Sequence, residues 1–170
     1  HVFDDESDWI FKTTEGEMVL EFWPDVAPGH VENFKKLAKQ GFCDGTCFHR
    51  VIKGFMVQGG GFDPEMNHKP TEATIQNEAN NGLKNMKYTL AMARTNAPHS
   101  ASAQFFINTV DNDFLNFKSE TASGWGYAVF GRVVEGQDVV DAMEKVKTGR
   151  SGFHDDVPVE ALVVEKAVEI

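Results

Sequence analysis

The sequence predicts a mainly β domain, in which an antiparallel sheet rolls into a closed or nearly closed barrel and two helices cover its open ends. Three observations predict this class. About seven or eight short segments have the β-branched and aromatic composition of strands. Two segments, one early and one late, have the apolar spacing of amphipathic helices. The strands do not alternate regularly with helices, so βαβ winding is not expected, and closing the sheet would bury both helix stripes.

The length and composition fit one folded domain. The chain of 170 residues can bury a single core, so we expect a flexible acidic arm at residues 1–8 and one domain at 9–170. Its 14 Phe can fill that core without a buried hydroxyl that needs a partner. The net charge of −10 argues against binding to nucleic acid or to an anionic membrane surface.

The compartment is open to two interpretations. No apolar run is long enough to cross a bilayer, and residues 1–10 lack the basic and apolar regions of a signal peptide. The chain begins without Met, so we expect that an upstream segment was removed or left out. We predict a cytoplasmic monomer, with a periplasmic or secreted protein as the alternative. Cys43 and Cys47 lack C-x-x-C spacing, so we expect reduced thiols rather than a zinc site or a disulfide.

The first predicted elements are a hairpin and a helix. Residues 9–13 and 18–23 have strand composition and flank a Glu-Gly-Glu turn. Pro28 fits the first turn of a helix that runs to about Gln40, and Gly41 can end it. An apolar stripe on this helix indicates core packing rather than a ligand face. The positions of the stripe are Val31, Phe34, Lys35, Leu37 and Ala38.

Residues 48–61 predict a second hairpin, which holds the most informative polar pair. Its strands surround a turn at Gly54, so Arg50 lies opposite Gln58 and on the same face. An arginine is costly to bury unless its donors are satisfied, and Gln58 is a partner across the ladder. This stretch alone leaves two interpretations open: an edge hairpin with a solvated Arg50, or a functional site. The glycines at 59–61 indicate a bend.

The rest of the chain combines a long loop, further strands and a second helix. Residues 62–87 are irregular and rich in Pro, Asn and Glu, and a loop of this length in a compact domain is usually functional or disordered. The second helix is predicted at residues 136–147 and a loop at 148–157. Further strands are predicted at residues 88–94, 103–108, 127–134 and 162–168.

The usual signals of nucleophilic, metal or cofactor chemistry are missing from the sequence. It has no G-x-S-x-G motif and no nucleotide-binding glycine loop, so no cofactor is predicted. The histidines lack metal-ligand spacing, so no metal site is predicted. His99 and Ser100 put a base beside a hydroxyl, but sequence neighbours on a turn rarely form a triad. A hydrolase that uses these two residues stays open as an alternative.

Three stretches carry motifs that occur together in one family. They are Phe-His-Arg-Val-Ile and Gly-Phe-Met-Val-Gln-Gly-Gly within residues 48–60, Met-Ala and Ser-Ala-Gln-Phe-Phe-Ile within 92–107, and Val-Phe-Gly at 129–131. Together they resemble the cyclophilins, the peptidyl-prolyl cis-trans isomerases (EC 5.2.1.8). Residues 77–83 and 114–117 are similar to the bacterial branch. The resemblance implies a closed eight-stranded antiparallel β-barrel capped by two α-helices, and an enzyme that accelerates rotation about X-Pro bonds and assists protein folding.

The resemblance also implies a site on the outer face of the barrel. Arg50 would donate to the prolyl nitrogen and stabilise the twisted amide, while Gln58 orients the guanidinium. Gln104 and the backbone of Arg94 would bind the substrate backbone. The proline ring would lie in an apolar pocket formed by Phe55, Met56, Phe106, Phe114, Leu115 and Tyr127. The expected partners are proline-containing peptides and folding protein chains.

Three positions depart from patterns found in relatives. Phe114 stands where cyclosporin-sensitive relatives have Trp, so an indole N–H donor is missing and weak cyclosporin binding is expected. Arg94 stands where eukaryotic relatives have Asn, and Tyr127 where many have His. A module that binds proline peptides without catalysis is the remaining alternative, and the presence of Arg50 favours the enzyme.

Overall fold

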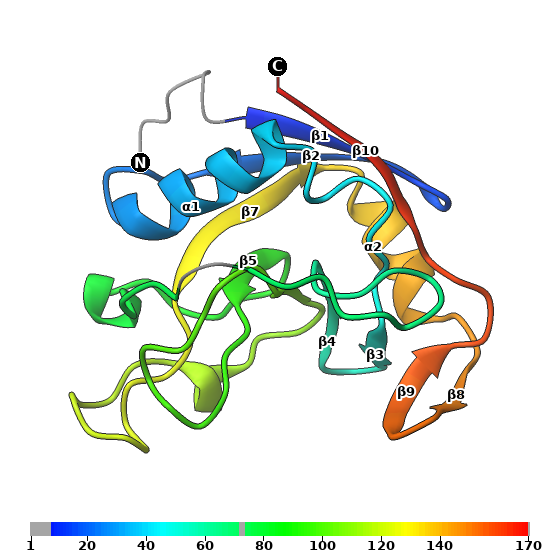
Figure 1. Cartoon of the computed structure of the whole chain (residues 1–170). Helices are drawn as coiled ribbons and strands as arrows, with labels where there is room; N and C mark the ends of the chain where they lie inside the picture. The colour runs from blue at the N-terminus through cyan, green and yellow to red at the C-terminus, as the bar shows by residue number, and fades with distance from the viewer. Residues whose placement is uncertain (1–7, 72–73, 170) are drawn as a thin grey trace.

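The computed structural model describes residues 8–71 and 74–169, and its main feature is a rolled antiparallel sheet (Figure 1). The sheet has eight strands in the order β10-β1-β2-β7-β5-β6-β4-β3, and every neighbouring pair is antiparallel. The mainly β class and the eight antiparallel strands are therefore confirmed. The strands are β1 (Asp8–Thr13), β2 (Gly16–Phe22), β3 (Arg50–Ile52), β4 (Met56–Gly59), β5 (Thr89–Met92), β6 (Phe105–Asn108), β7 (Val129–Glu135) and β10 (Val164–Glu169).

The ladder stops short of a closed barrel. The edge strands β10 and β3 do not pair with each other. The segment before β3 fills the gap with single backbone hydrogen bonds instead. Phe48 N donates to Leu162 O at 2.8 Å, and Val164 N donates to Thr46 O at 2.7 Å. These bonds hold the two edges together without a continuous ladder.

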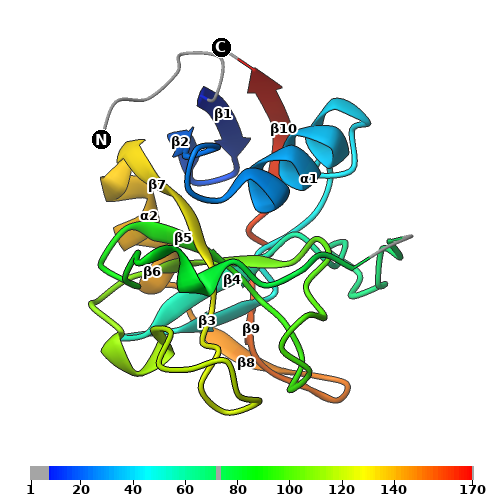
Figure 2. The same cartoon turned by 90° about the vertical axis from the view of Figure 1, so that its left-hand side faces the viewer.

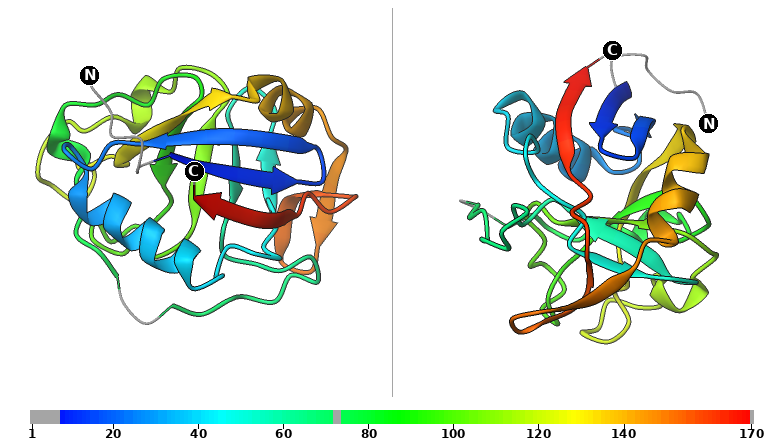
Figure 3. Two further views of the ribbon diagram at one scale, coloured as in Figure 1. Left: turned by 90° about the horizontal axis from the view of Figure 1, so that it is seen from above. Right: turned by 90° about the vertical axis from the view of Figure 1, so that its right-hand side faces the viewer.

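Two helices lie at opposite ends of the sheet (Figures 1 and 3). Helix α1 (Pro28–Lys39) begins with the predicted Pro28 and buries Phe34, whose ring centroid lies 4.7 Å from that of Phe22. Helix α2 (Gln137–Glu144) packs on β2, β3 and β4. It ends three residues before the predicted end at residue 147, because the chain leaves the helix after Lys145 and extends into a strand.

The region predicted as a loop at residues 148–157 is instead a two-stranded ribbon. Strands β8 (Thr148–Ser151) and β9 (His154–Pro158) pair in antiparallel fashion, and β9 packs against β3. The turn between them includes Gly152 at φ +60°. The prediction was wrong because this segment is polar and lacks apolar alternation, so backbone pairing forms the ribbon without the usual sequence signal.

The predicted acidic arm at residues 1–8 falls mostly outside the described residues. The structure describes it only from Asp8, which is the first residue of β1. Among the described residues, no helix is long and apolar enough to span a membrane.

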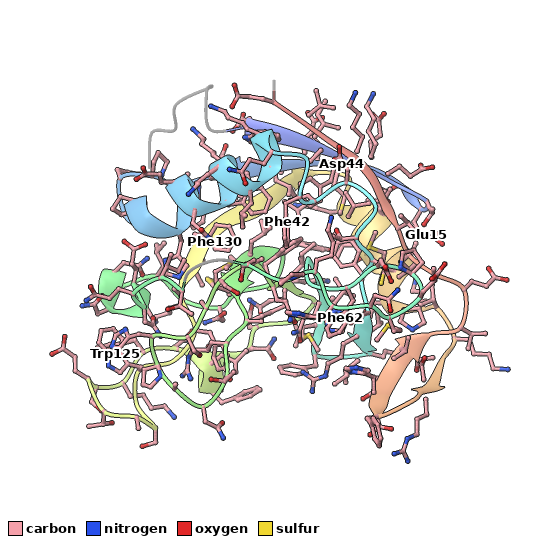
Figure 4. The ribbon with its side chains drawn as sticks, viewed as in Figure 1. Glu15, Phe42, Asp44, Phe62, Trp125 and Phe130 are labelled. Atoms are coloured by element: carbon pink, nitrogen blue, oxygen red, sulfur yellow. The ribbon has the colours of Figure 1, made fainter. Side chains whose placement is uncertain are left out.

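The pleat divides the buried side chains of the central strands into two clusters. The inner cluster packs beneath α1, where Figure 4 labels Phe130, and includes Val57, Leu90, Phe105, Ile107 and Phe130. The outer cluster includes their sequence neighbours Met56, Ala91, Phe106 and Val129. The chain between β6 and β7 lies on the side of β5 and β6 away from α1 (Figure 2). Alternation along the strands therefore builds a second, smaller apolar layer on the outside of the sheet.

Candidate active site

A small pocket opens on this outer layer, between the β3–β4 hairpin, the ends of β5 and β6, and the chain before β7. Its cavity volume is about 140 Å³. Pockets for drug-sized ligands are larger, at roughly 300–1,000 Å³, so this pocket suits one small ring. It is lined by Arg50, Phe55, Met56, Gln58, Ala93, Arg94, Phe106, Leu115 and Tyr127. Eight of these nine residues are among those the sequence predicted, and Ala93 is the addition.

Two polar side chains, Arg50 and Gln58, form one wall of the pocket, and the predicted Gln104 lies behind them outside the lining. Arg50 pairs with Gln58 across β3 and β4, in the predicted register. Arg50 Nη1 donates to Gln58 Oε1 at 3.3 Å, and Gln58 Nε2 donates to Gln104 Oε1 at 3.0 Å. A guanidinium can only donate, so Gln58 presents its oxygen to Arg50 and its NH₂ group to Gln104. Arg50 is exposed and forms no salt bridge with any described residue, so most of its five N–H donors stay available to a ligand.

The opposite walls of the pocket are apolar. Met56, Phe106 and Leu115 are buried, and the Phe106 ring meets the Tyr127 ring edge-on at 5.7 Å between centroids. Phe55 stacks on Phe114, with 5.7 Å between centroids. Phe114 itself does not line this pocket: 64% of its surface is exposed, and it borders a second hollow next to the first.

Arg94 braces the pocket with its side chain, whereas the sequence assigned a role only to its backbone. Its Nε donates to Gly126 O at 3.0 Å and its Nη1 to Thr95 O at 2.8 Å. The guanidinium lies over the Tyr127 ring, 4.5 Å from the centroid. A cation stacked on an aromatic face is favourable, so Arg94 holds Tyr127 in position. Ala93 N bonds to Gln104 O at 2.9 Å, and its only sequence signal was the Met-Ala motif.

Sequence reasoning missed a set of three buried asparagines behind the apolar wall, here called the asparagine chain: Asn85, Asn108 and Asn112. Asn112 Nδ2 donates to Asn108 Oδ1 at 2.8 Å, and Asn108 Nδ2 donates to Asn85 Oδ1 at 3.1 Å. The chain ends on backbone carbonyls of the pocket. Asn112 Nδ2 reaches Phe55 O at 2.9 Å, and Asn85 Nδ2 lies 3.3 Å from Leu115 O and 3.2 Å from Tyr127 O. The asparagine-rich composition of the long loop was a signal for Asn85 alone, because Asn108 and Asn112 lie at and after the end of β6.

The residues of the alternative hydrolase hypothesis are engaged elsewhere. His99 Nδ1 accepts a hydrogen bond from Asn77 N at 3.0 Å. Ser100 Oγ donates to Ala97 O at 2.6 Å and accepts from Thr95 N at 3.0 Å. Among the described residues, neither of these contacts joins Ser100 to a base that could activate it. Over residues 8–71 and 74–169, no group of three or more His, Cys, Asp or Glu side chains could hold a metal ion.

A rolled eight-stranded antiparallel sheet with two helices is the fold that the resemblance to the cyclophilins implies. Comparison with known families agrees: residues 9–169 match the family model described as cyclophilin type peptidyl-prolyl cis-trans isomerase/CLD. The chain belongs to this family and is a peptidyl-prolyl cis-trans isomerase.

The chain is similar in sequence to bacterial isomerases over nearly their whole length. Peptidyl-prolyl cis-trans isomerase B of Escherichia coli (strain K12) is 59% identical over 155 residues, which is 91% of this chain and 94% of that protein. The isomerase cyp18 of Streptomyces antibioticus is 63% identical over 91% of this chain and 93% of that protein. A crystal structure of a Cryptosporidium parvum cyclophilin type isomerase superposes with a TM-score of 0.79 at 25% identity, covering 96% of both chains.

Proposed function

We propose that the enzyme isomerises X-Pro bonds by donating a hydrogen bond from Arg50 to the prolyl nitrogen, while the proline ring sits in the 140 Å³ pocket. The observation that carries this proposal is the polar chain from Arg50 through Gln58 to Gln104 along the edge of an apolar pocket. In this arrangement, the guanidinium of Arg50 would lie beside the nitrogen of a proline whose ring fills the pocket.

The physics of the amide explains why one donor is enough. The peptide C–N bond resists rotation by about 18–20 kcal/mol, because resonance is lost when it twists. In the twisted state the prolyl nitrogen becomes pyramidal and gains a lone pair. A donor at that nitrogen binds the twisted form more strongly than either planar form, and this difference in binding lowers the barrier. No nucleophile or general base takes part in the step.

Each remaining wall residue has a part in holding the substrate. Met56, Phe106 and Leu115 bury the proline ring, and their own burial supports a preformed pocket. Gln58 keeps the guanidinium of Arg50 aligned, because its own amide is tied to Gln104. The stack of Arg94 on Tyr127 keeps the rim rigid, so little conformational entropy is lost when a peptide binds.

The proposed substrates are proline-containing peptides and folding protein chains. A Cryptosporidium parvum relative with a TM-score of 0.79 to this chain was solved in the presence of the dipeptide Ala-Pro, which supports this class. Cyclosporin is proposed to bind weakly, because Phe114 offers no N–H donor at the rim.

Prolyl peptide isomerisation by Arg50→Ala, Arg50→Lys and wild type tests the proposal. We expect kcat/KM to fall about 10²–10³-fold in Arg50→Ala, the usual cost of removing a transition-state donor. Arg50→Lys should recover only part of the rate, because an ammonium lacks the guanidinium fork. The matched control is Arg150→Ala, on the exposed β8–β9 ribbon. Equal rates for Arg50→Ala and wild type would refute the mechanism.

A further inference from the structure

A second hollow lies beside the proline pocket, and the Arg94–Tyr127 stack forms the wall between them. Its cavity volume is about 390 Å³, larger than the pocket for the ring. Arg94 and Tyr127 line both spaces. Consecutive Cα atoms of a peptide are about 3.8 Å apart, so a residue one or two positions from a bound proline can reach over this stack.

The charge of the second hollow is opposite to that of the whole chain. Its lining contains two cations, Arg94 and Lys118, and no acidic side chain. Asn96, Asn116 and Ser123 add polar groups. The chain as a whole carries a net charge of −10, so a hollow of this composition is a local exception. Three acidic residues lie in the chain between β6 and β7, Asp111, Asp113 and Glu120, but none of them is among the lining residues.

The cations differ in how they are held. Arg94 is fixed by its two carbonyl partners and its stack on Tyr127, which leaves Nη2 without a bond to the described protein. Lys118 is exposed and forms no ion pair with a described residue. A carboxylate between them would accept a hydrogen bond from the preorganised guanidinium of Arg94 and form an ion pair with the exposed ammonium of Lys118.

The wall that carries Lys118 is ordered by its own contacts. Lys118 N and Ser119 N both donate to Gly124 O, at 2.7 and 3.1 Å. A side chain at Gly124 would overlap Ser119, so the turn closes tightly only with glycine. Trp125, labelled in Figure 4, anchors the end of the turn, with 7% of its surface exposed and its ring 5.3 Å from that of Phe117. The hollow therefore exists before a ligand binds.

We propose that this hollow is a specificity subsite for an acidic side chain next to the substrate proline. The carboxylate would lie between Arg94 and Lys118, and its aliphatic stem against the exposed ring of Phe114. The inference rests on the proposed function, because it needs a proline in the neighbouring pocket. The enzyme would then prefer clients with Asp or Glu within two residues of the proline, despite its own acidity.

A set of matched short peptides tests the subsite. Each contains one proline, with Glu or Gln in turn at the two positions before and the two after it. Isomerisation is measured with wild type, Lys118→Gln and Lys12→Gln, a control with the same charge change on exposed Lys12 of β1. The readout is kcat/KM of the Glu peptide divided by kcat/KM of the matching Gln peptide. At one position, we expect this ratio to be about 3- to 10-fold higher in wild type and Lys12→Gln than in Lys118→Gln. The ratio in wild type should decline as the salt concentration rises.

Comparing the same peptides across variants removes any intrinsic difference between Glu and Gln peptides. A ratio that is identical in wild type and Lys118→Gln at all four positions would overturn the subsite. That result, together with turnover that still depends on Arg50, would leave the proposed function intact. Turnover that does not depend on Arg50 would overturn the proposed function, whatever the ratio.

Discussion

Replacing Asn108 with Ala should destabilise the protein by about 2–4 kcal/mol, although Asn108 touches no substrate. Its side chain is fully buried and makes three hydrogen bonds, to Asn85 at 3.1 Å, Thr89 at 3.0 Å and Asn112 at 2.8 Å. Each such bond contributes about 0.5–1.5 kcal/mol net, and a buried polar atom without a partner costs about 1–3 kcal/mol. In Asn108→Ala the buried Oδ1 of Asn85 loses the donor described for it.

Urea unfolding of Asn108→Ala, Asn85→Ala and the double variant measures the effect. The double variant has no Asn85 oxygen left without a donor. Its loss of unfolding free energy should therefore be smaller than the sum of the two single losses by about 1–3 kcal/mol. Asn80→Ala, on the exposed side of the same loop, is the control and should change the free energy of unfolding by less than about 0.5 kcal/mol.

The same variant should also lose activity while it is still folded. The asparagine chain ends on the carbonyls of Phe55, Leu115 and Tyr127, which lie around the pocket. We expect kcat/KM of Asn108→Ala to fall several-fold at a low temperature where its circular dichroism is native. A free energy of unfolding within about 0.5 kcal/mol of wild type, with additive single variants, would refute the reasoning.

Three further predictions concern the site and its surroundings. Gly61→Ala should lower kcat/KM about tenfold, because its Cβ would overlap the Gln104 side chain and displace one hydrogen bond. The control is Gly149→Ala, where a Cβ would make only an ordinary van der Waals contact, and its kcat/KM should not change. Equal losses of kcat/KM in both variants would contradict the role of Gly61. Burial lowers the pKa of His49 from 6.5 to about 4. The unfolded chain therefore takes up the proton first, so stability should fall by about 3 kcal/mol as the pH drops from 6.5 to 4. Urea unfolding across this range should show a shallower fall in His49→Phe, and equal slopes would contradict the assignment. Cyclosporin should inhibit wild type at micromolar concentrations or weaker, and about tenfold more tightly in Phe114→Trp, whereas nanomolar inhibition of wild type would contradict the role of the missing donor.

The parts of the site that follow from local rules were predictable from the sequence. The turn at Gly54, which has φ +76°, fixes the register that pairs Arg50 with Gln58. The alternation of side chains along β4 and β6 then puts Met56 and Phe106 on the outer face. Both steps need only the spacing of residues within one hairpin or strand.

The parts that depend on distant neighbours were not predictable in this way. The Gln58 amide is oriented by Gln104, 46 residues away, and the Arg94 side chain is bound by a carbonyl 32 residues away. The glycines at 59–61 were interpreted as a bend, and Gly60 does have φ +89°. Gly61 has a different reason to be glycine, the closeness of Gln104, which is visible only in the folded chain.

Exchange spectroscopy on a saturating proline peptide tests the central claim most directly, because it reports the rate of cis–trans interconversion on the enzyme separately from the Kd. If Arg50 stabilises the twisted amide, Arg50→Ala should slow interconversion of the bound peptide by about 10²–10³-fold. The Kd should change by less than about threefold, since the planar forms gain little from that donor. An unchanged interconversion rate in the bound state, with activity lost only through weaker binding, would contradict the account.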